Sequence, residues 1–157
     1  MPDPGLPPAD LVFIPVTSEA LWQEARRVRQ RVFVEEQACP PEEEWDAWDS
    51  WATSGAHHVV MQVRGETVGV ARWHATEHEG ATAARLGRFA VLAEYRGHGL
   101  GHALVEHVSE TAARAGFGRQ VLYAQAHLEA FYEGFGFRRC GADFWDVGIL
   151  HVPMSKG

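Results

Sequence analysis

The sequence has few cysteines and no long hydrophobic run. Cys39 and Cys140 are the only two cysteines among 157 residues, and they form no Cys-x-x-Cys motif. This pattern predicts free thiols in a reducing cytoplasm. No apolar run approaches the ~18 residues that a membrane-spanning helix needs, and the proline-rich start lacks the basic and apolar regions of a signal peptide. We therefore expect a cytoplasmic protein without a membrane partner.

Basic residues are scarce relative to acidic ones. The chain has 14 lysines and arginines against 21 aspartates and glutamates, which gives a formal net charge of −7. A protein that binds nucleic acid needs a basic surface to meet the phosphate backbone, so nucleic acid is excluded as the main partner. A hydrophobic content of 46% and six tryptophans exclude a disordered acidic chain.

The length of the chain favours one domain with a buried core. Prolines recur within the first eight residues and predict a disordered tail over residues 1–10. The remaining residues, 11–157, are expected to form a single domain, present as a monomer or a homodimer.

Several catalytic and binding motifs are also absent. No Lys follows Gly101, as a P-loop would require, and no Gly-x-Gly-x-x-Gly or Gly-x-Ser-x-Gly motif occurs. His98, His102 and Glu106 are spaced four residues apart, but His98 precedes the first turn of the helix that we expect there. The sequence therefore predicts no metal site.

The most informative stretch is a strand, a glycine-rich turn and a helix in direct succession. Residues 86–92 are largely apolar and predict a buried strand. Gly97, Gly99 and Gly101 follow within five positions. The helix after them has one apolar face at 3.6-residue spacing, made of Leu100, Ala103, Leu104, Val108, Thr111, Ala112 and Ala115.

This succession is typical of a phosphate-binding turn. The first turn of a helix has backbone N–H groups without partners and a partial positive charge. Glycines let the backbone approach a ligand closely, and Arg96 is placed to add charge. The alternative interpretation is a tight connection that only lets the strand and the helix pack together.

The rest of the pattern predicts an α/β layered domain with a mixed sheet of six or seven strands and about four helices. Pro15 suggests an edge position for the first strand, Thr17 or Ser18 caps the first helix, and 77–83 is expected to be a loop. Strands are expected over 11–16, 56–63, 67–74, 86–92, 120–124, 137–140 and 149–154, and further helices from 18 to about 33 and over 128–135.

Residues 42–51 combine five carboxylates with three tryptophans. Such a segment could form a wall that receives a cationic amine through ion pairs and cation–π contacts. The alternative is a solvated acidic loop whose tryptophans cover the core.

Three stretches resemble the GNAT superfamily of N-acetyltransferases. Arg96, Gly99 and Gly101 match the Arg/Gln-x-x-Gly-x-Gly/Ala loop that binds acetyl-CoA in that family. Residues 125–137, Gln-Ala-His-Leu-Glu-Ala-Phe-Tyr-Glu-Gly-Phe-Gly-Phe, resemble its Asn-x-x-Ala-x-x-Leu-Tyr-x-x-x-Gly-Phe segment, with Gln125 in place of Asn. Residues 31–37 and 148–154 resemble the ElaA-like branch of the family.

The resemblance implies a mostly antiparallel GNAT-type sheet and acetyl transfer from acetyl-CoA to an amine by direct attack in a ternary complex. The amine belongs to a small molecule, a protein lysine or a protein N-terminus. The residues that the resemblance assigns to cofactor binding are Phe89, Ala90, Val91, Arg96, Gly97, His98, Gly99, Leu100, Gly101 and Gln125.

Two catalytic roles follow from the same resemblance. Tyr132 would protonate the leaving thiolate, because a phenol stays protonated at neutral pH. Glu36 is the first candidate for the base that deprotonates the amine. The alternatives are a water chain or one of the histidines at positions 58, 74, 127 and 151. A competing interpretation is a non-catalytic domain that senses or regulates through acyl-CoA, and a third is a structural or interaction domain.

Overall fold

The structure is a computed structural model that describes residues 10–157. Its strands form one sheet in the order β1-β2-β3-β4-β5-β8-β6, and β7 pairs with β8. The strands are β1 (Leu11–Pro15), β2 (His57–Val63), β3 (Glu66–His78), β4 (Ala81–Val91), β5 (Gln120–Gln125), β6 (Arg138–Arg139), β7 (Phe144–Asp146) and β8 (Ile149–Lys156). Only β4 and β5 pair in parallel. The sheet is therefore mixed and mostly antiparallel, as the resemblance implied, and Pro15 does lie in an edge strand. Except for Asp10, the predicted tail over 1–10 lies outside the described residues.

The helical segments are α1 (Glu19–Arg29), the π-helical η1 (Gln30–Glu36), α2 (Pro41–Glu44), η2 (Ala47–Asp49), η3 (Ala93–Tyr95), α3 (Leu100–Arg114), η4 (Ala126–Leu128) and α4 (Glu129–Glu133). Ser18 caps α1 as predicted, because its hydroxyl oxygen accepts a hydrogen bond from the Leu21 amide at 3.2 Å. The first helix continues past residue 33 with π-helical winding, and the Gln37 amide donates to the Val32 carbonyl oxygen at 3.0 Å. π-helical turns often occur at functional sites.

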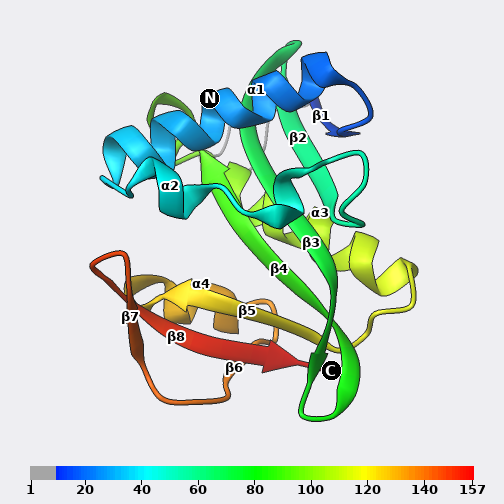
Figure 1. The fold of residues 1–157 in the computed structure, drawn as a ribbon, viewed down its shortest axis with the longest axis vertical. Helices are drawn as coiled ribbons and strands as arrows, with labels where there is room; N and C mark the ends of the chain where they lie inside the picture. Colours follow the sequence, from blue (N-terminus) through cyan, green and yellow to red (C-terminus); the bar gives the residue numbers. More distant parts are fainter. Residues whose placement is uncertain (1–9) are drawn as a thin grey trace.

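Helices cover both faces of the sheet. Neighbouring residues of a strand point to opposite faces, and β2 follows this rule. Val59 and Met61 belong to one buried cluster with Leu104 of α3, whereas Val60 belongs to another with Val28 of α1. The sheet therefore separates α1 from α3, with one apolar core on each side (Figure 1).

The sheet divides where its two parallel strands diverge. β4 and β5 are paired only at Ala84–Gln120 and Arg85–Val121. Beyond these pairs the strands separate, and Figure 1 shows β4 rising towards α1 while β5 runs alongside β8. Helix α3 connects β4 to β5 and begins at the end of β4 where the strands are apart.

A bulge in β4 lies beside this division. Val70 of β3 faces Ala90, and Arg72 faces Gly87, so two residues of β4 lie opposite one residue of β3. Arg88, inside the bulge, has a φ of 55°. A long side chain rarely adopts this left-handed conformation, and bulges of this kind re-aim side chains next to binding sites.

Two predictions of secondary structure were wrong. The expected loop over 77–83 is instead a tight hairpin, because β3 runs to His78 and β4 begins at Ala81. Glu79 and Gly80 turn the chain with φ values of 50° and 76°, as two-residue hairpins require. The three-residue strand β7 was not expected, and with it the described sheet has eight strands rather than six or seven.

No helix in the described part of the chain is long and apolar enough to cross a membrane. Within residues 10–157, no group of three or more His, Cys, Asp or Glu residues could hold a metal ion. Cys39 and Cys140 are both free thiols, as predicted.

Candidate active site

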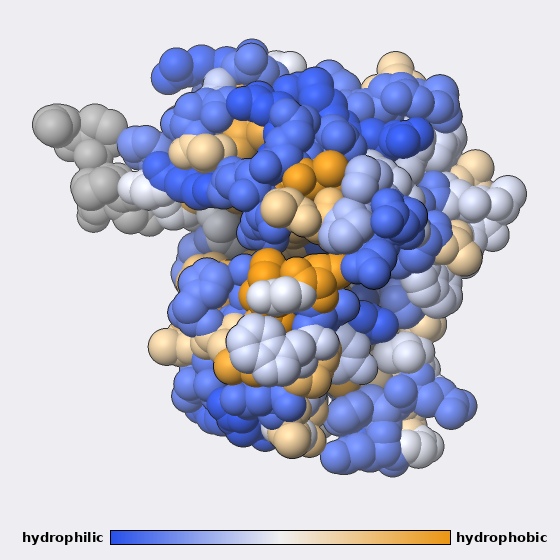
Figure 2. All heavy atoms as spheres, turned by 60° about the vertical axis from the view of Figure 1, so that its left-hand side comes forward, coloured by the Kyte–Doolittle hydropathy of each residue, from blue (hydrophilic) through white to orange (hydrophobic). Residues whose placement is uncertain are grey.

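A cleft of about 660 Å³ opens where β4 and β5 diverge. Figure 2 shows apolar side chains gathered in the hollow between the two halves of the molecule. Tyr132 and Glu36, the two predicted catalytic residues, both line the cleft. So do nine of the predicted cofactor-binding residues, which are Phe89, Ala90, Val91, Arg96, Gly97, Gly99, Leu100, Gly101 and Gln125. The His98 side chain is exposed and does not line the cleft.

The glycine turn presents unpaired backbone amides to this cleft. Gly97 and Gly99 have φ values of 86° and 77°, a conformation that favours glycine. The Ala103 amide donates to the Gly99 carbonyl oxygen at 3.1 Å, so the amides before Ala103 lie in the first turn, where no helical acceptor exists. Together with the positive end of α3, these amides form a seat for an anion.

Arg96 lies beside the turn and is held by two contacts. Its Nε donates to the Val91 carbonyl oxygen at 2.9 Å, and its Nη1 and Nη2 donate to the Glu36 carboxylate at 2.6 and 3.0 Å. Both side chains are about two-fifths exposed, at 43% and 40%. The pair joins the π-helical segment to the glycine turn, and an anion in the cleft would compete with Glu36 for the guanidinium.

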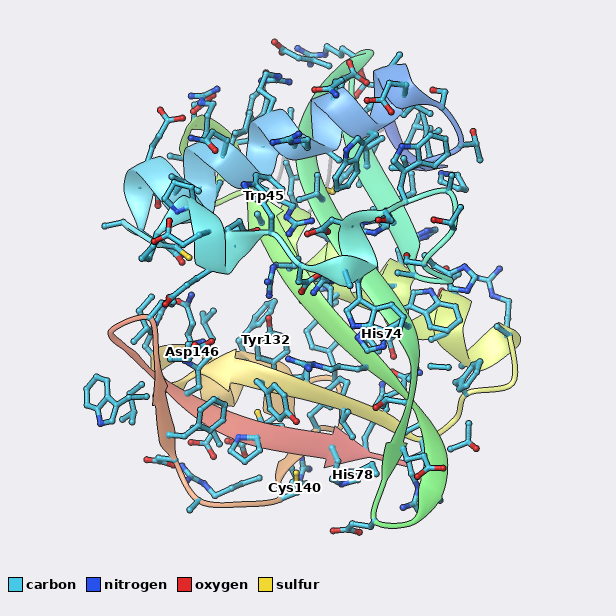
Figure 3. All side chains as sticks on the ribbon, viewed as in Figure 1. Trp45, His74, His78, Tyr132, Cys140 and Asp146 are labelled. Carbon is cyan, nitrogen blue, oxygen red and sulfur yellow. The ribbon has the colours of Figure 1, made fainter. Side chains whose placement is uncertain are left out.

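Tyr132 projects from α4 into the space between β4 and β5 (Figure 3). It is only 6% exposed, and its ring packs near those of Phe89, Phe131 and Phe137. Burial raises the pKa of the Tyr132 phenol, so the group carries its proton at neutral pH. Among the described residues, no group hydrogen-bonds to its hydroxyl, which is therefore free for a ligand.

Gln125, at the end of β5, is not free in the same way. Its Nε2 donates to the Gln37 Oε1 at 3.0 Å. Both side chains line the cleft, so the pair ties the end of the π-helical segment to β5. The sequence alone predicts no role for Gln37, because its partner Gln125 is 88 positions away.

A second, smaller cavity continues from the cleft past Tyr132. This inner cavity has a volume of about 160 Å³ and shares Phe89, Gln125 and Tyr132 with the cleft. Arg88 of the β4 bulge and His151 of β8 lie on its other side. A molecule here would approach the cleft from the side opposite the glycine turn.

His151 is the candidate base that lies in the inner cavity. Its Nδ1 is 2.8 Å from the Ile149 carbonyl oxygen, and because a carbonyl oxygen can only accept, Nδ1 carries the proton. In the neutral ring this leaves an unprotonated Nε2. The geometry therefore gives His151 a nitrogen able to accept a proton.

The other candidate histidines lie elsewhere. His58 is buried, and its Nε2 lies 2.8 Å from the Trp48 carbonyl oxygen. His74 stacks on the Trp48 ring with 3.7 Å between ring centroids. Burial lowers the pKa of both histidines, which keeps them neutral at pH 7. His127 lines the cleft near α4.

The acidic segment 42–51 is largely occupied with internal ion pairs. Arg29, which is 1% exposed, donates to Glu44 at 2.7 Å and to Asp49 at 2.5 Å. Arg72 donates to Asp46 at 2.6 Å and to Asp49 at 3.0 Å. These three carboxylates fasten the segment to α1 and β3, so they are not free to receive a cationic amine.

The tryptophans of the same segment are also engaged. Trp45 lies beneath the Arg26 and Arg29 guanidinium groups, at 4.8 and 4.6 Å from its ring centroid. The Trp51 Nε1 donates to Glu19 at 3.2 Å. Both contacts fix the segment against α1 rather than leaving its rings open for a ligand.

The sequence of residues 21–157 matches a family model described as an acetyltransferase (GNAT) domain. The chain is 32% identical over 140 residues to the uncharacterized N-acetyltransferase YjcF of Bacillus subtilis. The alignment covers 88% of this chain and 94% of YjcF. It is similar in structure to ElaA of Escherichia coli, with 26% identity, a TM-score of 0.81 and coverage of 94% of this chain and 99% of that one. An acyl-CoA N-acyltransferase from Pseudomonas aeruginosa has 28% identity, a TM-score of 0.80 and the same coverage, 94% and 99%.

Proposed function

The chain belongs to the GNAT acetyltransferase family, and we propose that it moves an acetyl group from acetyl-CoA to an amine by direct attack in a ternary complex. The family match confirms the resemblance seen in the sequence. The observation that carries the proposal is that the glycine turn, the free edge of β4 and Tyr132 line one cleft. Acetyl-CoA supplies the activated acyl group, so the protein must position both substrates, stabilise the oxyanion and move protons.

The glycine turn and Arg96 would bind the pyrophosphate of acetyl-CoA. Unpaired amides at the positive end of a helix suit a phosphate, and the guanidinium adds a paired set of donors. Beyond Arg85, β4 no longer pairs with β5, so residues 89–91 have a free strand edge for the pantetheine arm. A backbone N–H of that edge would stabilise the oxyanion that develops on the thioester carbonyl.

Tyr132 would return a proton to the departing thiolate of CoA. Its hydroxyl has no partner among residues 10–157 and faces the cleft. Since burial raises its pKa, the phenol is protonated whenever the thiolate forms. It therefore satisfies the first requirement of a general acid, which is to hold the proton at the working pH.

For the base that deprotonates the amine, the contacts favour His151 over Glu36. The Glu36 carboxylate is engaged with Arg96 at the phosphate end of the cleft. His151 lies in the inner cavity with Tyr132, and its Nδ1–H is held by a backbone carbonyl group. An amine in the inner cavity would reach the thioester from the side of His151.

Calorimetric titration with acetyl-CoA and with CoA tests the proposal. We expect saturable binding that the double variant Gly99→Val/Gly101→Val abolishes, because side chains there block the turn and Val strains the positive φ of Gly99. The matched control is Gly55→Val/Gly118→Val. Gly55 also has a positive φ, 84°, and added Cβ atoms at both positions meet no atom within 4 Å.

Two outcomes would reject the proposal in different ways. Absence of binding by the wild-type protein would remove the basis for any acyl-CoA function. Binding without acetylation of any amine would favour the competing interpretation, a domain that senses acyl-CoA without catalysis.

A further inference from the structure

Two neighbouring cavities beyond the cleft have several lining residues in common. The inner cavity begins at Tyr132, and an outer cavity of about 90 Å³ continues from it, with Arg88, Tyr123 and His151 lining both. The order is therefore cleft, inner cavity and outer cavity. An acceptor whose amine lies in the inner cavity would extend its other end into the outer cavity.

The outer cavity is bordered by more cationic than anionic side chains. Arg72, Arg85 and Arg88 line it, against a single carboxylate, Asp146. Arg72 is matched by Asp46 and Asp49, at 2.6 and 3.0 Å. Arg88 also lies near the Glu44 and Asp46 carboxylates, at 3.3 and 3.5 Å, so Arg85 contributes most to the positive charge of this cavity.

Arg85 has no carboxylate partner in the described part of the chain. Its guanidinium lies over the Tyr123 ring, 4.4 Å from the centroid. An arginine stacked on an aromatic ring keeps its edge donors free. Arg85 therefore offers an unmatched positive charge to the outer cavity.

Arg88 is only partly satisfied. Its Nη2 donates to the Glu44 carbonyl oxygen at 2.9 Å and lies 3.5 Å from the Asp46 carboxylate. Its Nε lies 3.3 Å from the Glu44 carboxylate without forming a hydrogen bond. The same carboxylate is also paired with Arg29. Burial lowers the pKa of Arg88, against the opposing effects of the Glu44 and Asp46 charges. An anion beside Arg88 would supply the hydrogen-bond acceptor that its Nε lacks.

Gly87 leaves room for such an anion. It lines both the inner and the outer cavity, and a Cβ added there would meet no atom within 4 Å. At Gly87 the strand thus presents no side chain to either cavity, and a ligand group would lie there, beside Arg88.

We propose that the acceptor is a small aminocarboxylate whose carboxylate binds Arg85 and Arg88 in the outer cavity. The inference rests on the proposed function, since its amine would lie in the inner cavity beside Tyr132 and His151. A planar carboxylate fits the paired N–H donors of a guanidinium group. A rim cavity of about 100 Å³ shares Arg88, Asp146 and His151 with the outer cavity and is also lined by Glu43 and Glu44, which suits an amine that arrives as an ammonium ion.

Acceptor kinetics at saturating acetyl-CoA test the inference. The panel contains α-, β- and γ-amino acids, each beside the amine that lacks the carboxylate and the aminoalkyl phosphate of similar length. We expect the carboxylate to raise kcat/KM by about 10- to 100-fold, as hydrogen bonds to charged groups do. The variant Arg85→Gln removes this preference by raising the KM for the aminocarboxylate, and Arg85→Lys restores part of it.

The control variant is Arg114→Gln, an exposed arginine of α3 that pairs with Glu110. It removes the same charge without touching either cavity and should leave the KM unchanged. Equal kcat/KM with and without the carboxylate, a preference for the phosphate, or no effect of Arg85→Gln would each overturn the inference while the acetyltransferase activity stood. Absence of acetyl-CoA binding would instead overturn the proposed function and the inference together.

Discussion

The Tyr132 side chain is largely buried, but its hydroxyl makes no hydrogen bond to the described residues, whereas the hydroxyl of a buried tyrosine usually finds a protein partner. Three aromatic rings hold it in place, and the hydroxyl faces the cleft. The fold thus leaves one polar atom without a protein partner where a ligand would supply it. A purely structural tyrosine would not need to lie at that position.

The variant Tyr132→Phe separates chemistry from binding. We expect kcat to fall by about 100-fold or more, because general acids contribute factors of this order. Calorimetry should show an unchanged Kd for acetyl-CoA. Tyr95→Phe, which removes a hydroxyl hydrogen-bonded to Glu66, is the control and should leave kcat unchanged. Equal losses in the two variants would contradict the role of Tyr132.

Glu36 pairs with Arg96 in addition to being a candidate base, and the two roles predict different effects of a substitution. Its carboxylate holds Arg96 at 2.6 Å, and its negative charge offsets the positive charge that a phosphate would meet. Glu36→Gln should therefore lower the Kd for CoA several-fold and leave kcat unchanged. The control Glu94→Gln disrupts another exposed pair, with Arg31. A large fall in kcat, together with a changed pH profile, would instead identify Glu36 as the base.

At the scale of elements, the sequence predicted the parts whose determinants are local. The strand, the glycine turn and α3 are consecutive, so apolar periodicity and three glycines sufficed to place them. Strands β2 and β3 were likewise predicted from neighbouring residues, over 56–63 and 67–74. The features that the sequence did not predict depend on pairing between strands. The bulge at Arg88 arises from register with β3, and β7 is three residues that pair only with β8.

The same distinction applies to the site. Nine of the ten residues predicted to bind the cofactor line the cleft, and all of these except Gln125 come from one continuous segment, residues 89–101. The acceptor side combines β4, β5 and β8, which only the sheet brings together. Arg85 and Arg88, two charges in an otherwise apolar strand, were the available signal. The sequence alone could not reveal that Glu44, Asp46 and Asp49 are used by other arginines.

The segment from α2 to η2 is held mainly by that buried ion network. Removing one partner of a buried pair leaves an uncompensated charge. Arg29→Met should therefore cost about 3–5 kcal/mol of unfolding free energy, measured by urea denaturation. Arg31→Met, which breaks the exposed pair with Glu94, should cost about 1 kcal/mol or less. Similar losses in both variants would show that the network does not carry this stability.

For the whole molecule, buried titratable groups predict sensitivity to acid. Burial lowers the pKa of His58 and His74, and partial burial lowers that of His107. Burial alone would raise the pKa of Asp49, but its hydrogen bonds and ion pair with Arg29 outweigh this and hold the pKa below its usual value. In both cases the unfolded chain binds protons at a pH where the folded chain does not.

Each group therefore makes its full contribution to the free energy of unfolding when the pH is above the pKa that the group has in the unfolded chain. This contribution is lost as the pH falls below that value. For the histidines the loss begins near pH 6.5, and for Asp49 it begins near pH 4, the usual values in unfolded chains. Urea denaturation between pH 8 and pH 4 should show a constant free energy of unfolding down to about pH 7 and a progressive fall below it. His58→Gln should reduce the upper part of that fall, because a glutamine takes up no proton in the unfolded chain. A free energy that stayed constant between pH 7 and pH 5 would mean that protonation of these histidines is not linked to unfolding.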